Sequence, residues 1–230
     1  MKIALVLLVR NERPCLEIML PKIPPASPEA GYDEVVAVDG GSTDGSVEFL
    51  QAHGIRIVGQ SKRGRGEAFH QAFREVAADA YIFFSPDGNE DVADFPRFRT
   101  LLDAGAEIVI ASRMMKGAVN EEDHLTFKWR KWANNAFNMM ANFAFRRRGP
   151  FITDTINGFR AITKEAVGKL GLDASDYTIE YQMSMRALKA GLAIAEFPTI
   201  EGQRVAGGTQ AHSIPTGLRF LKCFWRELRT

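Results

Sequence analysis

The chain has 230 residues but only two cysteines, Cys15 and Cys223, and their spacing is not that of a metal site. So few cysteines exclude a disulfide-rich secreted fold and favour a reducing, cytoplasmic compartment. No stretch reaches the roughly 20 apolar residues that a membrane-spanning helix requires. The net charge is only +1, so the chain has no overall field that would attract nucleic acid.

Two common phosphate-binding motifs are also missing. The first apolar segment, residues 2–9, is predicted to be a strand, and no GxGxxG sequence follows it. No GxxxxGK[ST] loop occurs anywhere in the chain. These absences argue against a nicotinamide-dependent dehydrogenase and against a P-loop enzyme.

What the chain does have is an alternation of strand and helix signals up to about residue 117. The predicted strands cover residues 2–9, 35–38, 55–58, 81–84 and 107–110. Predicted helices lie between them, at residues 15–23, from the 42–44 cluster to 53, at 67–78, and after Asp94, which could act as an N-cap. This order predicts an α/β fold with a mostly parallel central sheet flanked by helices.

The pattern changes in the second half. Apolar residues at helical spacing predict a long helix over 124–145, and a short strand is expected after Gly158. Thr163 could cap a short helix that ends near Gly171. Residues 177–190 and 215–228 are predicted helices, and 192–197 a strand. We therefore expect a single domain in which the pattern of elements changes after Gly117.

The sequence motifs are organised around residues 35–46, where an apolar strand runs directly into Asp39, a glycine pair and a cluster of helix N-cap residues. Gly40 and Gly41 would allow a tight turn with positive φ. Ser42, Thr43 or Asp44 could cap the next helix. Ligands bind at the carboxyl ends of strands in open α/β sheets, so this position suggests a binding role for Asp39. The alternative is an ordinary strand-to-helix turn.

Acidic residues follow three of the predicted strands, namely Glu12, Asp39 and Asp87. Asp87 and Asn89 offer hard oxygen ligands that suit Mg²⁺ or Mn²⁺ together with phosphate oxygens. The alternative for this segment is a Pro-Asp-Gly turn. Four arginines follow loops or lie near helix starts and could clamp phosphates: Arg113, Arg130, Arg160 and Arg204.

Basic residues are concentrated in the second half of the chain. Residues 124–148 contain six Lys or Arg and no acid, and 204–230 contain five basic residues against the single Glu227. We expect Trp129, Trp132, Phe137 and Phe143 to pack in the core. The alternative is a helix at a membrane interface. The final helix has the same two interpretations, with core packing or a homodimer face as the first.

With these motifs in order, the chain resembles family 2 glycosyltransferases of the GT-A fold, and among them the dolichyl- or polyprenyl-phosphate mannose and glucose synthases. The matching blocks contain residues 10–12, 38–46, 65–68, 85–89, 111–113, 154–160, 179–182, 196–198 and 204–210. Residues 38–46, for example, are similar to the family's VDDGSTDGT stretch, and residues 85–89 to its Asp-x-Asp-x-Gln metal segment.

The resemblance implies an inverting transfer of a hexose from a GDP- or UDP-sugar to a polyprenyl phosphate, with a divalent cation as cofactor. It implies a nucleotide-binding half at residues 1–117 and an acceptor and phosphate half at residues 118–230. It implies nucleotide contacts by Asn11, Glu12, Asp39, Gly41, Ser42, Arg65, Gly66 and Ser85. It places Asp87 and Asn89 on the metal, and Arg113, Arg130 and Arg204 near the phosphates. The catalytic set would be Asp87, Asp154, Glu180 and Arg204, with Asp154 and Glu180 on the side of the sugar or acceptor. A hydroxyl acceptor would need one of these two carboxylates as a general base. Such an enzyme could associate with the cytoplasmic membrane face, directly or through a membrane partner protein.

Three positions depart from the family pattern. Gly40 replaces the second acid of the nucleotide-binding stretch, Ser85 replaces the first acid of the metal segment, and Gln210 stands where lysine is frequent. The changes at Ser85 and Gln210 motivate an alternative function, a nucleotide-sugar or carbohydrate-binding module that does not catalyse transfer.

Overall fold

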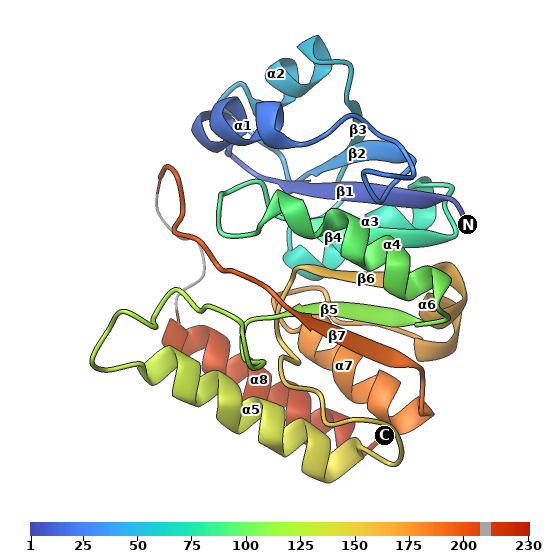
Figure 1. Cartoon of the computed structure of the whole chain (residues 1–230), viewed down its shortest axis with the longest axis vertical. Helices are drawn as coiled ribbons and strands as arrows, with labels where there is room; N and C mark the ends of the chain where they lie inside the picture. Colours follow the sequence, from blue (N-terminus) through green and yellow to red (C-terminus); the bar gives the residue numbers. More distant parts are fainter. Residues whose placement is uncertain (208–212) are drawn as a thin grey trace.

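A computed structural model describes residues 1–207 and 213–230, with only the backbone described at 213 and 214. Its centre is a seven-stranded sheet in the order β3-β2-β1-β4-β6-β5-β7, flanked by helices on both faces (Figure 1). This confirms the predicted α/β fold. The strands are β1 (Ile3–Val9), β2 (Glu34–Asp39), β3 (Arg56–Gly59), β4 (Ala80–Phe84), β5 (Ile108–Ser112), β6 (Arg160–Thr163) and β7 (Ile194–Pro198).

Two apolar layers hold the helices against the sheet. Strand β4 is buried along its whole length, as expected of a strand covered on both faces. On one face, α1 (Arg13–Met19), α2 (Ser46–Ala52) and α4 (Phe95–Asp103) contribute to the core. The other face carries α3 (Arg65–Glu75), α5 (Trp129–Phe145), α6 (Lys164–Leu170), α7 (Ile179–Ala190) and α8 (Ser213–Glu227).

The two halves of the chain share the sheet. Strand β6 lies between β4 and β5 and runs antiparallel to both, whereas all the other neighbouring strands are parallel. Strand β7 pairs with β5 from the first half. The residues after Gly117 therefore complete the sheet, and the carboxyl ends of β1, β2, β4 and β5 form one edge at which loops from both halves meet.

The long helix α5 begins at Trp129, so the predicted start at residue 124 was wrong. The carboxylate of Glu122 accepts hydrogen bonds from the backbone N–H of Lys131, at 3.0 Å, and from Arg130. A side chain from outside the helix thus satisfies a free N–H of the first turn, and a continuous helix would remove it from that position.

The aromatic residues of α5 do not all pack in the core. Phe137 packs against Tyr181 and Phe220. Trp129, Trp132 and Phe143 are exposed, with Phe143 at 79%. The expectation that these three side chains are core residues was wrong, because they lie on the face of α5 that is turned away from the sheet.

The capping predictions had different outcomes. Thr163 accepts a hydrogen bond from the N–H of Ala166, which confirms it as the cap of α6. Asp94 occupies the N-cap position of α4, as predicted, but its side chain makes no capping hydrogen bond. Its carboxylate binds the hydroxyl of Thr199 and the guanidinium of Arg97 instead. Gly45, at φ 86°, takes the N-cap position of α2 that was expected at residues 42–44.

Helix α8 is fixed to α7 by Glu227, whose buried carboxylate accepts hydrogen bonds from Gln182, Arg186 and Lys189. Burial alone would raise the pKa of Glu227, but these hydrogen bonds outweigh it and lower the pKa from 4.5 to about 2. A depressed pKa stabilises the folded state above the pKa of the unfolded chain. This contribution is lost as the pH falls through the folded pKa.

We therefore expect the free energy of unfolding to fall by about 3 kcal/mol between pH 4.5 and pH 2 through this group. Urea unfolding at a series of pH values measures the change. In Glu227→Gln, the free energy of unfolding should be lower at pH 7 and the slope over this interval shallower. Equal slopes in the two proteins would contradict the assignment.

Candidate functional site

Two cavities open at the edge where the parallel strands end. The smaller one, of about 260 Å³, lies beyond β1 and β2 and is lined by Arg10, Glu12, Gly40, Gln60 and the start of α3, among others. The larger one, of about 560 Å³, extends from the loop after β4 towards α5, α7 and α8. Arg65, Ser85, Asp87 and Tyr177 line both cavities. The cavities therefore meet at these four residues.

Asp39, the last residue of β2, stabilises the turn that follows this strand. Its carboxylate accepts hydrogen bonds from the backbone N–H groups of Gly41 and Ser42 and from the Ser42 hydroxyl, at 2.5 to 3.3 Å. The Ser42 hydroxyl also accepts from the N–H of Asn11, which joins the ends of β1 and β2. Gly41 has a φ of 82°, as predicted, but Gly40 does not have a positive φ.

Asn11, Asp39, Gly41 and Ser42 thus belong to one hydrogen-bonded turn and do not line either cavity. Glu12 does line the smaller cavity. The nucleotide contacts of the turn residues stay predictions. Gly40 lies at the cavity wall, and a Cβ there would be 2.9 Å from Oε1 of Gln60. Gln60 occupies the space that an acidic side chain at position 40 would need.

The start of α3 brings Arg65 to the junction of the cavities. A Cβ at Gly66 would lie 2.1 Å from the carbonyl oxygen of Ala174, so only glycine allows this close approach. The predicted nucleotide-binding residue Gly66 thus packs against a backbone loop and lines neither cavity. Arg65 forms an ion pair with Glu180, and its Nη1 lies 3.4 Å from the Ser85 hydroxyl. Glu180 lines the larger cavity, and its role on the side of the sugar or acceptor stays a prediction.

The loop after β4 has the donor set of a divalent cation site. Oδ1 of Asp87 accepts the N–H of Asn89, and Oδ1 of Asn89 is buried without a hydrogen-bond partner. An unpaired buried oxygen is costly unless something binds it. Among the described residues, no three His, Cys, Asp or Glu side chains converge on one point. Asp87 and Asn89 therefore fit a cation whose remaining ligands come from a bound diphosphate and water.

Arg204, in the loop after β7, lines the smaller cavity. It forms ion pairs with Glu12 and with Asp87, the second at 3.2 Å. The N–H of Val205 donates to the carbonyl oxygen of Asp87, so the loop is fixed beside the candidate metal site. Burial raises the pKa of Asp87, while the Asn89 N–H and the charge of Arg204 partly oppose this. Gln210, the third departure from the family pattern, lies outside the described residues.

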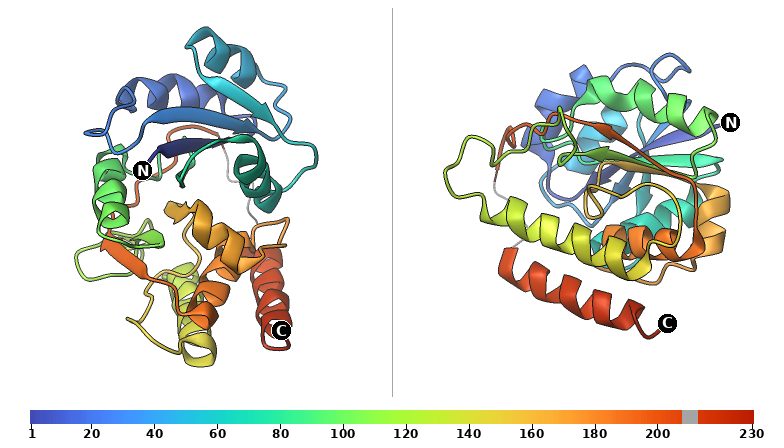
Figure 2. Two further views of the ribbon diagram at one scale, coloured as in Figure 1. Left: turned by 90° about the vertical axis from the view of Figure 1, so that its right-hand side faces the viewer. Right: turned by 60° about the horizontal axis from the view of Figure 1, so that its bottom comes forward.

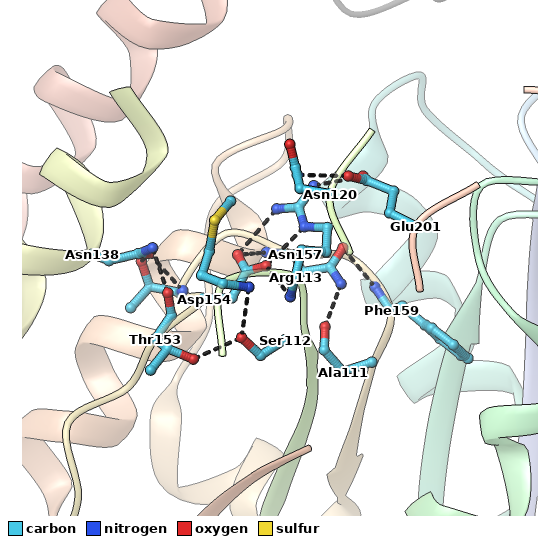
Figure 3. Close-up of polar contacts among 12 residues, drawn as sticks. Ala111, Ser112, Arg113, Asn120, Asn138, Thr153, Asp154, Asn157, Phe159 and Glu201 are labelled. Carbon is cyan, nitrogen blue, oxygen red and sulfur yellow. Dashed lines mark hydrogen bonds and ion pairs between the residues drawn. The ribbon is translucent and has the colours of Figure 1, made fainter. Parts of the chain in front are cut away.

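Arg113, at the end of β5, is held by two carboxylates (Figure 3). It donates to Asp154 through Nε at 2.7 Å and Nη2 at 3.0 Å, and to Glu201 at 3.0 Å. Asp154 is fully buried and does not line the larger cavity. Burial alone would raise the pKa of Asp154, but the charge of Arg113 keeps it below 3.8. The backbone around Asp154 is in turn anchored by Glu196 on β7.

Arg130 also lines the larger cavity, and it is paired with Glu121 at 2.9 Å and with Glu122 at 2.7 Å. Arg160 is buried and binds backbone carbonyls of Asn157 and Glu180. A phosphate in the larger cavity would therefore meet arginines that already have carboxylate partners.

Several residues that line the cavities were not predicted as site residues: Arg10, Gln60, Glu90, Glu121, Glu122, Tyr177 and Glu201. Glu201 could have been found, since it lies shortly after the end of β7, as Glu12 and Asp87 do after β1 and β4. Glu90 is in the same acidic loop as Asp87. Gln60 and Tyr177 carry no motif that would distinguish them from other polar residues.

Curated relatives cover most of the chain at modest identity. Glycosyltransferase AglJ of Haloferax volcanii is 27% identical over 172 residues, which are 74% of this chain and 54% of that protein. The chain thus spans about half the length of AglJ. Polyprenol monophosphomannose synthase of Mycolicibacterium smegmatis is 25% identical over 211 residues, 86% of this chain and 76% of the relative.

Solved structures confirm the fold. Glucosyl-3-phosphoglycerate synthase from Mycobacterium tuberculosis, in complex with Mn²⁺, uridine diphosphate and phosphoglyceric acid, superposes with a TM-score of 0.76 at 20% identity. The match covers 99% of this chain and 78% of that structure. The family model for glycosyl transferase family 2 matches residues 5–171, nearly three quarters of the chain. The chain therefore belongs to glycosyl transferase family 2 and is a glycosyltransferase of the GT-A fold.

Proposed function

We propose that this enzyme transfers a hexose from UDP- or GDP-sugar to a polyprenyl phosphate, with inversion at the anomeric carbon. The observation that carries the proposal is the pair of cavities that meet at Arg65, Ser85, Asp87 and Tyr177. The smaller cavity would hold the nucleotide and the larger one the acceptor. The larger cavity is charged near Arg113 and apolar near Phe137 and Leu221, which suits a phosphate with a hydrocarbon chain.

In this arrangement Asp87 and Asn89 would hold a divalent cation, which when bound neutralises negative charge on the departing diphosphate. Arg65 and Arg204 lie beside Asp87 and add positive charge at the junction. An acceptor phosphate in the larger cavity attacks the anomeric carbon opposite the diphosphate. The new carbon–oxygen bond forms as the old one breaks, which inverts the configuration. A phosphate is already an anion at neutral pH and needs no general base.

A hydroxyl acceptor is a second candidate, favoured by the carboxylates in the larger cavity. Glu121 lines it, and burial together with the charge of Glu201 raises the pKa of Glu121, as a general base requires. Asp154 is unsuited to this role, because it is buried behind Arg113 with a lowered pKa.

Calorimetry with UDP and GDP, each with and without Mn²⁺, tests the nucleotide site. We expect binding of at least one of them, tightened by the metal. Release of nucleoside diphosphate from the matching sugar donor should then depend on polyprenyl phosphate. Binding of neither nucleotide would contradict the proposal, and binding without release for any acceptor would instead support a non-catalytic module.

Because the acceptor is a lipid, we propose that the enzyme acts at the cytoplasmic membrane face as a peripheral protein. No helix among the described residues is both long and apolar enough to cross a membrane.

A further inference from the structure

Helices α5 and α8 are each apolar on two sides. The inner side of α8 is buried through Phe220, Cys223 and Phe224. Its outer side exposes large apolar residues spaced by three or four positions: Leu218, Leu221, Trp225 and Leu228. Helix α5 likewise buries Ala141 and Phe145 and exposes another apolar series: Trp129, Trp132, Met139 and Phe143. A surface helix that only packs on a core needs one apolar face, so the outer series require another explanation.

The two helices that expose these residues are neighbours. Helices α5 and α8 lie side by side at the end of the molecule away from β3, as Figure 2 shows from two directions. A shallow groove between them is lined by Ala136, Met139, Met140, Phe143, Ala144 and Phe224. Exposed large apolar residues that gather on two neighbouring helices mark an interaction site. We name it the α5–α8 face.

Basic residues outnumber acidic ones on the two helices of this face. Helix α5 contains no acidic residue, and the single acid of α8, Glu227, is buried and paired. Lys222 and the run Arg146–Arg147–Arg148 after α5 are exposed. A two-fold dimer through this face would bring like charges together. An anionic lipid surface instead complements the basic residues, while tryptophans settle at the interface between headgroups and hydrocarbon.

The larger cavity is walled by the same two helices. Trp129, Leu218 and Leu221 line the cavity and are also exposed on the molecular surface. The cavity therefore opens at the α5–α8 face, and its lining also includes Asp87 and Arg113. An acceptor with a charged head and a hydrocarbon chain could reach the site from a bilayer at this face without crossing water.

We propose that the α5–α8 face docks directly on an anionic bilayer and opens the acceptor cavity to the hydrocarbon. The docking surface stands on the exposed residues alone, whereas the path of the acceptor rests on the proposed function.

Flotation of the full chain with vesicles tests the docking. We expect binding to vesicles of phosphatidylcholine with 30% phosphatidylglycerol, weaker binding at high salt, and little binding to phosphatidylcholine alone. The double variant Trp132→Ser with Trp225→Ser should bind at least about tenfold more weakly. Ile18→Ser is the matched control, since Ile18 is an exposed apolar residue on α1, away from this face. Its replacement should leave vesicle binding unchanged.

Circular dichroism and UDP or GDP calorimetry of the double variant separate the two proposals. Intact fold and nucleotide binding with lost flotation support the docking surface. Flotation in the absence of any nucleotide binding would leave docking standing and contradict the proposed function. Failure to float with anionic vesicles, or equal flotation of the double variant, overturns the docking. So does a dimer in solution that the double variant dissociates, or binding only when a membrane protein is present.

Discussion

Asp87→Asn should lower the rate of nucleoside diphosphate release by at least about 100-fold at a fixed, moderate Mn²⁺ concentration. Asp87 provides the one carboxylate of the candidate metal site, beside the orphaned oxygen of Asn89. Asparagine keeps the size of the side chain and can still accept the Asn89 N–H. What it removes is the negative charge that would attract a cation. Arg204 keeps its second partner, Glu12, so we expect the fold to persist.

The dependence on Mn²⁺ makes this prediction specific. If Asp87 is a metal ligand, the variant should require much more Mn²⁺ to reach its own maximal rate. Asp91→Asn is the matched control, because Asp91 is in the same loop but caps the short helix η2 (Val92–Asp94) through the Ala93 N–H. It should retain activity with an unchanged Mn²⁺ requirement. Wild-type rates with an unchanged Mn²⁺ requirement in Asp87→Asn would contradict the metal site.

The succession of strands along the chain and the position of the site edge could be predicted from the sequence, because both depend on local patterns. The order of the strands in the sheet could not, since it depends on tertiary pairing. The apolar run before Asp39 and the aromatic run before Ser85 are buried strands, as their lack of alternation indicates. Parallel strands place their carboxyl ends together, which puts Glu12 and Asp87 at one edge of the sheet. The structure joins them through Arg204.

The partners of the arginines could not be predicted, because they depend on tertiary pairing. Arg113 and Asp154 are 41 positions apart, and nothing local shows that one neutralises the other. From the sequence, an arginine near a predicted phosphate site is expected to be free to bind phosphate. In the structure, Arg113 and Arg130 each have two carboxylate partners. Gly66 has the same difficulty. Its motif suggested ligand contact, and only the nearby carbonyl of Ala174 reveals a packing reason.

Helical periodicity also could not decide which side of α5 is buried. The helix has apolar residues on both sides, so spacing alone allowed either side to face the core. Asn138 and Asn142 settle the matter in the structure, because both are buried and bind the backbone of residues 152–155. Two polar residues four positions apart were therefore on the inner side, and the tryptophans on the outer side.

Asp154→Asn should reduce the free energy of unfolding by about 3 kcal/mol, the lower end expected for breaking a buried ion pair. The change removes a buried charge and directs an amide N–H₂ towards the guanidinium of Arg113, where donor would face donor. Of its two carboxylate partners, Arg113 would keep Glu201, at 3.0 Å. The neighbouring Asn157 N–H, 3.2 Å from Oδ1 of Asp154, also depends on this carboxylate.

Urea unfolding measures the loss, and Asp103→Asn provides the matched control. Asp103 lies 3.9 Å from Arg99 with half of its side chain exposed, so its replacement should cost less than about 1 kcal/mol. Equal shifts in the two variants would contradict the structural role of Asp154. An Asp154→Asn protein that is as stable as the wild type but inactive would return Asp154 to the catalytic role that the family resemblance implies. The carboxylate of Asp154 is fully buried behind Arg113, so we expect the substitution to lower the free energy of unfolding directly. Any loss of activity should follow from the displacement of Arg113.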